Sequence, residues 1–121
     1  MIAPLFLGSL LVFQPQNTNN FQFRTLVDAC RDGAKTASQI TTKDNALSAG
    51  LCVGYISAIL DLQPILEKGG APRACIPNGV AIGDVIKIIV KYGDDHPEQL
   101  YRPQDEMALK AIAAAFPCGR R

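Results

Sequence analysis

The residues that enzymes use most for acid–base chemistry and substrate stacking are scarce in this sequence. Tryptophan is absent, aromatic residues make up 7% of the 121 positions, and His96 is the only histidine. No Gly-x-Ser-x-Gly elbow, His-Glu-x-x-His pair, Walker loop or dinucleotide fingerprint occurs. A nucleophilic cysteine would need a free thiol beside a histidine. We therefore expect no catalysis and no cofactor.

The sequence also has almost no excess of charge of one sign. Twelve Lys and Arg residues balance eleven Asp and Glu residues, which leaves a net charge of +1, without a basic stripe. Nucleic acid is excluded as a partner because phosphate binding needs concentrated positive charge. Hydrophobic residues make up 48% of the chain and charged residues 19%, so it can bury a core. Its length suits one domain.

The four cysteines, Cys30, Cys52, Cys75 and Cys118, form no Cys-x-x-Cys pair, and none has a histidine near it in sequence. A zinc site would need four separately delivered ligands, which is unusual, so we expect no metal site. The even number favours two disulfides in an oxidising compartment over four reduced, buried thiols. This interpretation requires export from the cytoplasm.

The N-terminus carries part of an export signal. Residues 2–13 form an uncharged, mostly apolar run, and the polar residues 14–20 follow it as a linker. Twelve residues are too few to span a bilayer but suit a signal peptide, although no basic residue precedes them and no Ala-x-Ala site follows. The alternative is a retained segment packed on the fold. Residues 1–20 are thus expected to be signal-like, and 21–121 to form a single helical domain.

The folded part has helical periodicity almost throughout and lacks the alternation of a sheet. We expect a small all-α bundle of about four helices, stapled by disulfides. Its helices are predicted at Phe21–Arg31, Asp44–Glu67, Val80–Tyr92 and from Pro103 to Phe116. Gly33, in a left-handed conformation, should end the first helix, Asp44 should cap the second, and Gly93 should stop the third.

Apolar residues recur at helical spacing in the second and third predicted helices. In the second, the predicted core stripe consists of Leu47, Leu51, Tyr55 and Ile59, widened by Val53, Ile56 and Leu60. Gly54 should admit a close helix crossing, and Asp61 should bond a loop backbone. The third is rich in Val and Ile, so a strand is the alternative, but its polar residues recur every three to four positions.

Helix ends predict which cysteines pair, because short connections make successive helices antiparallel. Cys75 precedes the third helix and Cys118 follows the fourth, so both lie at one end of the bundle. Cys30 ends the first helix and Cys52 lies early in the second. The favoured disulfides are Cys30–Cys52 and Cys75–Cys118, with Cys52–Cys75 as the competing pair.

Four short motifs in this order resemble the Rap/Tai immunity proteins of bacterial type VI secretion. They are Cys52–Ile56 followed by Asp61, Cys75–Pro77, Tyr92 with His96–Glu98, and Phe116–Cys118. The resemblance covers residues 24–118. It implies a periplasmic, disulfide-containing helical protein, often a homodimer, that binds a secreted peptidoglycan amidase and blocks its active site. The open alternatives are a periplasmic acid-stress chaperone of the HdeA kind and an envelope protein with another partner.

An inhibitor that plugs a cleft needs a projecting segment on a rigid support, and two connections qualify, Gly69–Arg73 and Gly93–Arg102. The second is longer and joins the helices that the Cys75–Cys118 bridge would hold. Its candidate partner-binding residues are Asp94, Asp95, His96, Glu98 and Tyr101. Their three carboxylates would suit a basic groove on the partner. Tyr101 would supply an aromatic anchor. The alternative is a solvated acidic turn.

Overall fold

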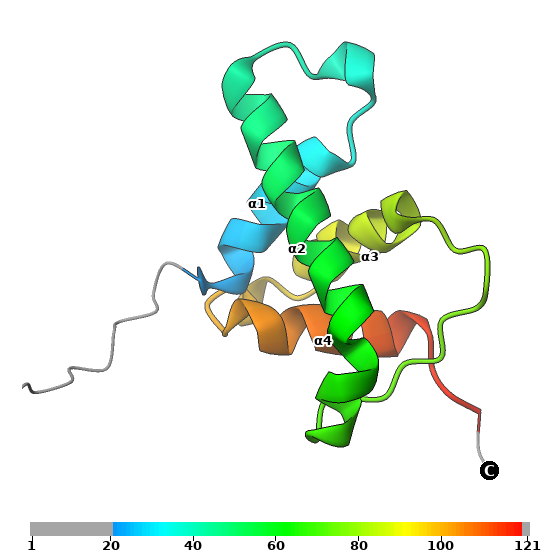
Figure 1. Cartoon of the computed structure of the whole chain (residues 1–121). Helices are drawn as coiled ribbons and strands as arrows, with labels where there is room; N and C mark the ends of the chain where they lie inside the picture. Colours follow the sequence, from blue (N-terminus) through cyan, green and yellow to red (C-terminus); the bar gives the residue numbers. More distant parts are fainter. Residues whose placement is uncertain (1–20, 120–121) are drawn as a thin grey trace, which may run out of the picture.

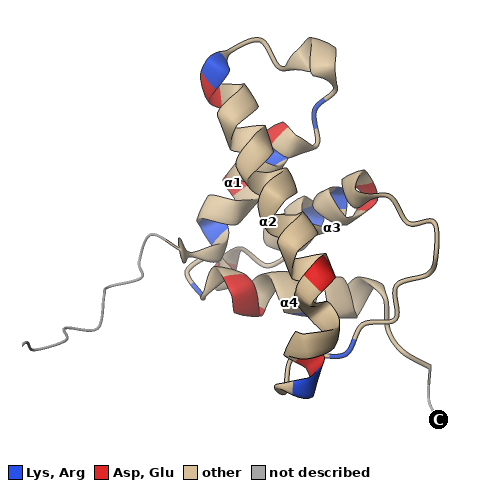
Figure 2. Cartoon of the chain, viewed as in Figure 1, with Lys and Arg blue, Asp and Glu red and all other residues tan. Residues whose placement is uncertain are grey.

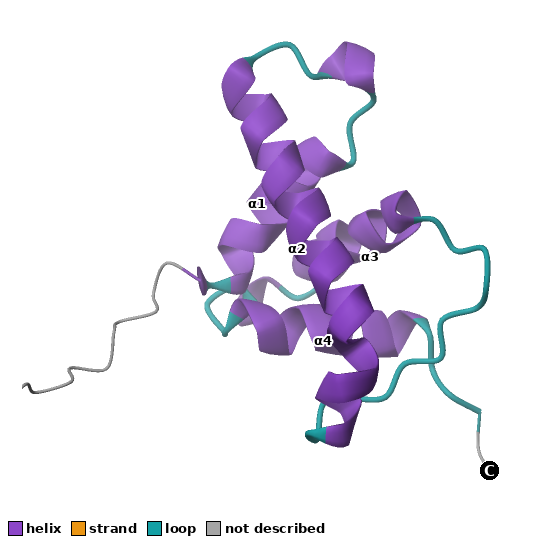
Figure 3. Cartoon of the chain, in the orientation of Figure 1, coloured by secondary structure: helices purple, strands orange, loops and turns teal. Residues whose placement is uncertain are grey.

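The computed structural model describes residues 21–119, and within them it contains helices and loops but no strand (Figure 3). The expected small all-α bundle is confirmed. Its elements, in order, are α1 (Phe23–Gly33), the 3₁₀ turn η2 (Ala37–Gln39), α2 (Lys43–Lys68), α3 (Ile82–Asp95), the 3₁₀ turn η3 (Pro97–Gln99) and α4 (Gln104–Ala115). The predicted signal-like segment lies outside the described residues.

Helix α1 packs against all three other helices and forms the centre of the bundle. It buries Phe23, Leu26, Val27 and Cys30. Gly33 is the last residue of α1, as expected, but it does not adopt a left-handed conformation, because its φ angle is not positive. A β-carbon at Gly33 would lie 3.1 Å from Cys52 Sγ, so the glycine makes room for α2 instead.

Helix α2 is the longest element, with 26 residues, and lies across the front of the bundle with the other helices behind it (Figure 1). Its N-cap is Thr42, whose hydroxyl accepts a hydrogen bond from the Asn45 backbone N–H at 3.1 Å. The prediction of Asp44 as the cap was wrong. Asp44 lies in the first turn, where its negative charge favours the positive end of the helix dipole.

The predicted core stripe of α2 is confirmed in part. Ile56 and Ile59 are buried, and Tyr55 and Leu60 are half-buried and pack against the core. The other three members of the stripe face solvent. Leu47 and Leu51 are 66% and 62% exposed, and Val53 is 39% exposed. The residues that α2 buries are Ala49, Cys52, Ile56, Ile59 and Gln63. Both sets recur at helical spacing, so periodicity alone cannot tell which one faces the core.

Two further expectations for α2 are not met. An ideal β-carbon at Gly54 has no neighbour within 4 Å, so no other helix of residues 21–119 crosses there. Asp61 is exposed, and its side chain makes no hydrogen bond to a loop backbone among the described residues. Gly54 and Asp61 are both exposed.

Helix α3 extends three residues beyond the predicted end at Tyr92, to Asp95, and the Val and Ile residues form a helix rather than a strand. Gly93 does not stop it. A β-carbon there would lie 2.6 Å from Val27 Cγ2 and 3.0 Å from Val27 Cγ1, so Gly93 permits the close approach of α1 and α3. Glycine therefore marks both tight crossings of α1.

Helix α4 follows Pro103 and ends before Pro117, as the sequence indicates, and it buries Met107, Ala108, Leu109, Ala111 and Ile112. Ala115, the last residue of α4, is exposed.

Two disulfides join the elements, Cys30–Cys52 between α1 and α2, and Cys75–Cys118 between the two segments that flank α3 and α4. These are the pairs that the helix ends favour. The Cys75 backbone N–H also donates to the Phe116 carbonyl at 2.8 Å. Cys30 and Cys52 have no exposed surface, whereas Cys75 is exposed.

We predict that replacing Gly93 by alanine destabilises the fold, because the added methyl would overlap Val27. Overpacking of this kind costs about 1–3 kcal/mol, which would lower the thermal midpoint by several degrees. Gly83→Ala is the matched control, since a β-carbon at Gly83 in the same helix meets nothing within 4 Å. The thermal midpoints of the parent and the two variants are compared by circular dichroism melting. Equal midpoints for Gly93→Ala and the parent would contradict the close crossing.

We also predict that no thiol titrates in unfolded, unreduced protein.

Under native conditions with dithiothreitol, the exposed Cys75–Cys118 bridge should be reduced before the buried Cys30–Cys52 bridge, because thiol exchange requires access to a sulfur atom. Timed alkylation followed by peptide mass spectrometry measures the order. Earlier labelling of Cys30 or Cys52 would be inconsistent with a closed α1–α2 contact.

Candidate functional site

The five candidate residues between Asp94 and Tyr101 do not form a free loop. Asp94 and Asp95 belong to the last turn of α3, and Glu98 lies in η3. His96 connects these two elements, and Tyr101 follows η3. We call residues 94–102 the α3–α4 segment.

Asp94 is held by α1. Arg31 Nη2 donates to Asp94 Oδ1 at 2.6 Å, across 63 positions of sequence. This hydrogen bond lowers the pKa of Asp94 below its ordinary value and raises the pKa of Arg31. About half of each side chain is exposed, so the pair positions α3 on α1 more than it stabilises the fold.

Asp95 and His96 are engaged within α3 itself. Lys91 Nζ lies 2.6 Å from Asp95 Oδ2, one helical turn away, and the pKa of Lys91 is raised by this hydrogen bond. The His96 ring stacks on Tyr92, with centroids 4.1 Å apart, and its Nδ1 lies 2.9 Å from the Tyr92 carbonyl oxygen. His96 therefore closes the end of the helix rather than projecting from it.

Glu98 and Tyr101 are the two candidates that face solvent most openly. Glu98 is exposed and has no ion pair within residues 21–119. Tyr101 is 64% exposed, and its hydroxyl accepts a hydrogen bond from Arg24 Nη2 at 3.1 Å. The Arg24 guanidinium also lies 5.0 Å from the centre of the Tyr101 ring. One free carboxylate and one oriented aromatic ring thus stand on this surface.

The backbone of the α3–α4 segment is fixed to the start of α1. The Phe23 N–H donates to the Arg102 carbonyl and the Arg24 N–H donates to the Leu100 carbonyl, both at 2.9 Å. Gln22 forms an isolated antiparallel bridge with Pro103. These bonds fix the backbone on either side of Tyr101 to the start of α1.

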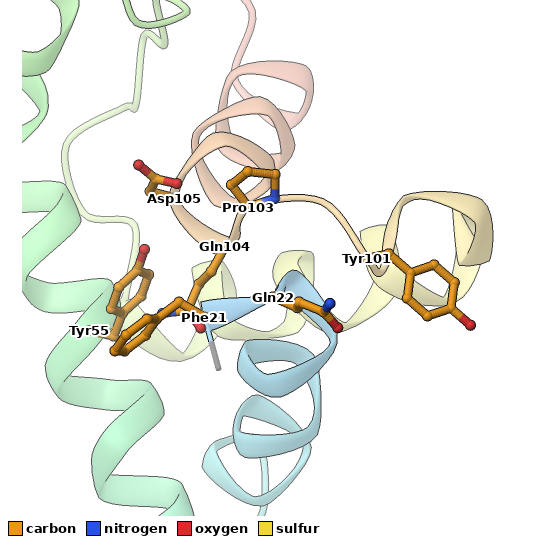
Figure 4. A pocket seen from close by; sticks show the side chains of 7 residues that line it. All are labelled: Phe21, Gln22, Tyr55, Tyr101, Pro103, Gln104 and Asp105. Carbon is orange, nitrogen blue, oxygen red and sulfur yellow. The ribbon is translucent and has the colours of Figure 1, made fainter. Parts of the chain in front are cut away.

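A pocket of about 440 Å³ lies beside this segment (Figure 4). Its lining residues are Phe21, Gln22, Tyr55, Tyr101, Pro103, Gln104 and Asp105. The Phe21 and Tyr55 rings lie together at one side, while the Tyr101 ring points away at the other (Figure 4). Burial raises the pKa of the Tyr55 phenol, and the charge of Asp105 adds to this effect, whereas Gln104 opposes it.

Sequence reasoning missed the residues of α1 that position the site, Arg24 and Arg31, and also missed Phe21. Arginines on the solvent side of an amphipathic helix give no local sign of a partner that lies more than 60 positions away. Their roles appear only once α1 and α3 are side by side.

The described residues contain no obvious metal centre. Within residues 21–119, no group of three His, Cys, Asp or Glu side chains is placed to hold a metal ion.

One helix of the described residues, α2, is long and apolar enough to cross a membrane. Its most apolar window has a mean hydropathy of 1.5, and 28% of that window is buried. One face of α2 is joined to α1 through Cys52, so much of its hydrophobic surface lies outside the core.

Comparison with known proteins identifies the family. The family model of the Rap1a immunity proteins matches residues 22–118, which include all four helices, both disulfides and the α3–α4 segment. No curated protein matches, and no solved structure matches. Because the match covers most of the chain, the chain belongs to the Rap1a immunity proteins.

Proposed function

We propose that this protein acts in the periplasm, where it binds a secreted peptidoglycan amidase and blocks its active site without catalysing a reaction. Membership of the Rap1a immunity proteins is the observation that carries the immunity role against a secreted effector. It favours this role over that of an acid-stress chaperone. The amidase target, type VI secretion and a homodimeric state are our extensions from the sequence resemblance.

The two disulfides support the periplasmic location. Disulfides persist in oxidising compartments, and the cytosol keeps most thiols reduced. In the chain-entropy model, the loops closed by Cys30–Cys52 and Cys75–Cys118, with separations of 22 and 43 residues, stabilise the fold by about 3 and about 4 kcal/mol. A domain of this size has a total stability of about 5–15 kcal/mol, so it depends on an environment in which these bonds form.

The α3–α4 segment is the surface that we assign to the amidase. Its backbone is bonded to α1, so little conformational freedom is lost when it enters a cleft. Glu98 offers a carboxylate to a catalytic histidine or a basic groove. Tyr101, oriented by Arg24, offers an aromatic anchor of the type enriched at binding hot spots. Asp94, Asp95 and His96 then serve mainly to shape the support.

We predict that the protein at equal concentration abolishes muropeptide cleavage by its cognate amidase. Hydrolysis products are measured by chromatography, with an amidase from an unrelated secretion system as the control. Undiminished cleavage in the presence of excess protein would remove the amidase from the proposal. Cleavage of muropeptides by the protein alone would contradict its non-catalytic role.

We predict that Glu98→Lys weakens amidase binding at least about tenfold, equivalent to 1.4 kcal/mol, because it places a positive charge against the basic groove. The thermal midpoint should change little, since Glu98 is exposed and has no ion pair with another described residue. Lys87→Glu is the matched variant, an exposed charge reversal on α3. Calorimetry measures the amidase binding and the thermal midpoint of both variants. Weaker binding for Lys87→Glu alone would place the contact on α3 instead.

A further inference from the structure

The pocket of about 440 Å³ beside the α3–α4 segment gathers much of the aromatic surface of the chain. Residues 21–119 contain six aromatic side chains, and three of them, Phe21, Tyr55 and Tyr101, line this pocket. We call it the aromatic pocket. Phe21 and Tyr101 are 62% and 64% exposed, so a partner has access to their rings. Exposed aromatic residues beside a hollow are typical of binding hot spots.

The aromatic pocket also carries a negative charge. Asp105 is the only charged residue that lines it. Asp105 is exposed and has no ion pair within residues 21–119. Nearby in the sequence, Arg102 lies 2.7 Å from Glu106, so its charge is already paired. Among the described residues, no cationic side chain pairs with the carboxylate of this pocket. Figure 2 shows the acidic first turn of α4 as the charged end of that helix.

The Tyr55 phenol lies near this carboxylate. Figure 4 shows the Tyr55 hydroxyl and the Asp105 carboxylate on the same side of the pocket, with the Phe21 ring below them in this view. Burial raises the pKa of the Tyr55 phenol, a hydrogen bond with Gln104 lowers it, and the charge of Asp105 raises it. The phenol is therefore neutral at physiological pH, and Asp105 alone sets the charge of the pocket.

Three parts of the chain form the walls of the aromatic pocket and are fixed before a ligand binds. Phe21 precedes α1, Tyr55 lies in α2, and Asp105 lies in the first turn of α4. The bridge between Gln22 and Pro103 joins the first of these parts to the last. A ligand that enters such a preformed pocket orders little of the chain, so less of its binding energy is lost.

We propose that the aromatic pocket receives an arginine side chain of the amidase, whose guanidinium bonds to the Asp105 carboxylate and stacks on the neighbouring rings. The inference rests on the proposed function, because the pocket is lined by Tyr101, which belongs to the α3–α4 segment that we assign to the amidase. It names the side chain that this surface selects in its partner.

A guanidinium fits this combination of groups better than other ligands do. It is planar and always charged, it donates paired hydrogen bonds to a carboxylate, and it stacks on aromatic faces. A lysine ammonium lacks the planar group that stacks. A calcium ion takes about six to eight oxygen ligands, often from several carboxylates, whereas Asp105 is the only carboxylate in the lining. An anionic ligand would be repelled by Asp105.

A second hollow shows that the pocket suits a protein chain rather than a free amine. This hollow, of about 460 Å³, shares Phe21, Tyr55 and Gln104 with the aromatic pocket. Gly50 and Gly54 also line it, and an ideal β-carbon on either has no neighbour within 4 Å, so the space beside α2 is open. A residue next to the arginine in the partner can place an apolar side chain there, which an isolated amine cannot do.

The chemistry of the pocket is tested with N-acetyl-arginine methylamide, titrated into ¹⁵N-labelled protein and followed by NMR. We expect the amide signals of Tyr55, Gln104 and Asp105 to shift with a dissociation constant on the order of 1 mM, as suits a single side chain. The citrulline analogue has nearly the same shape but no charge, and should bind at least about fivefold more weakly. Equal affinity for citrulline, tighter binding of the lysine analogue, or no shift up to about 20 mM would each overturn the proposal.

Variants of the lining locate the bound guanidinium. Asp105→Asn should raise the dissociation constant of the arginine compound at least about fivefold, because it removes the charge at almost unchanged size. Phe21→Ala should raise it about threefold, because a ring face is lost. The matched controls lie outside the aromatic pocket. They are Asp44→Asn, an exposed aspartate in the first turn of α2, and Leu47→Ala, an apolar side chain about as exposed as Phe21.

Circular dichroism establishes that each variant folds. If the control variants weaken binding of the arginine compound as much as the pocket variants do, the compound binds elsewhere and the proposal is wrong.

The assignment to the amidase is tested by calorimetry with the cognate enzyme. Asp105→Asn should weaken the complex at least about tenfold, whereas Asp44→Asn should leave its affinity unchanged. An unchanged affinity for Asp105→Asn would remove the aromatic pocket from the amidase interface and overturn the proposal. The arginine titration requires no amidase, so a failed inhibition assay contradicts the proposed function without altering the measured affinity of the pocket for a guanidinium.

Discussion

The rest of the structure depends on how closely α1 packs against its neighbours. At Gly33 a β-carbon would press on Cys52 Sγ, and at Gly93 it would overlap the Val27 side chain. Between these two contacts lies the buried Cys30–Cys52 bridge. Interiors packed at this density have little space to adjust, so the positions of α2 and α3 follow from that of α1.

The candidate site is a consequence of the same packing. Because α3 lies against α1, Arg31 reaches Asp94, and the start of α1 bonds the backbone of Leu100 and Arg102. These contacts engage some of the polar groups of the α3–α4 segment and orient Tyr101, while Glu98 has no ion pair with any residue from 21 to 119. A segment fixed in this way resembles a preformed plug, which loses less entropy on binding than a mobile loop.

Helix α2 has the opposite character. It is bound to the bundle by one face, and the face opposite is apolar and open to solvent. The small number of charges between its ends makes it similar in composition to a membrane-crossing helix. A long apolar face exposed to water is typical of an interaction site.

The sequence by itself determined the helical class and the approximate helix limits, because these depend on local periodicity and on breaking residues. It also favoured the observed disulfide pairs over Cys52–Cys75, because these follow from the order of helix ends. The family resemblance followed from motifs that include the cysteines and their neighbours.

Only the tertiary structure decided which face of α2 is buried and what the glycines are for. Apolar residues on both sides of a helix satisfy the same period, so Leu51 and Cys52 cannot be assigned to inside or outside until α1 is in place. Gly33 and Gly93 were expected to end helices because glycine commonly fills that role. Gly33 does end α1, whereas Gly93 lies within α3, and both glycines permit close contacts with residues distant in sequence. The ion pair of Arg31 with Asp94 was hidden for the same reason. Local sequence specifies conformation, whereas contact between helices is set by the shapes that they present to one another in three dimensions.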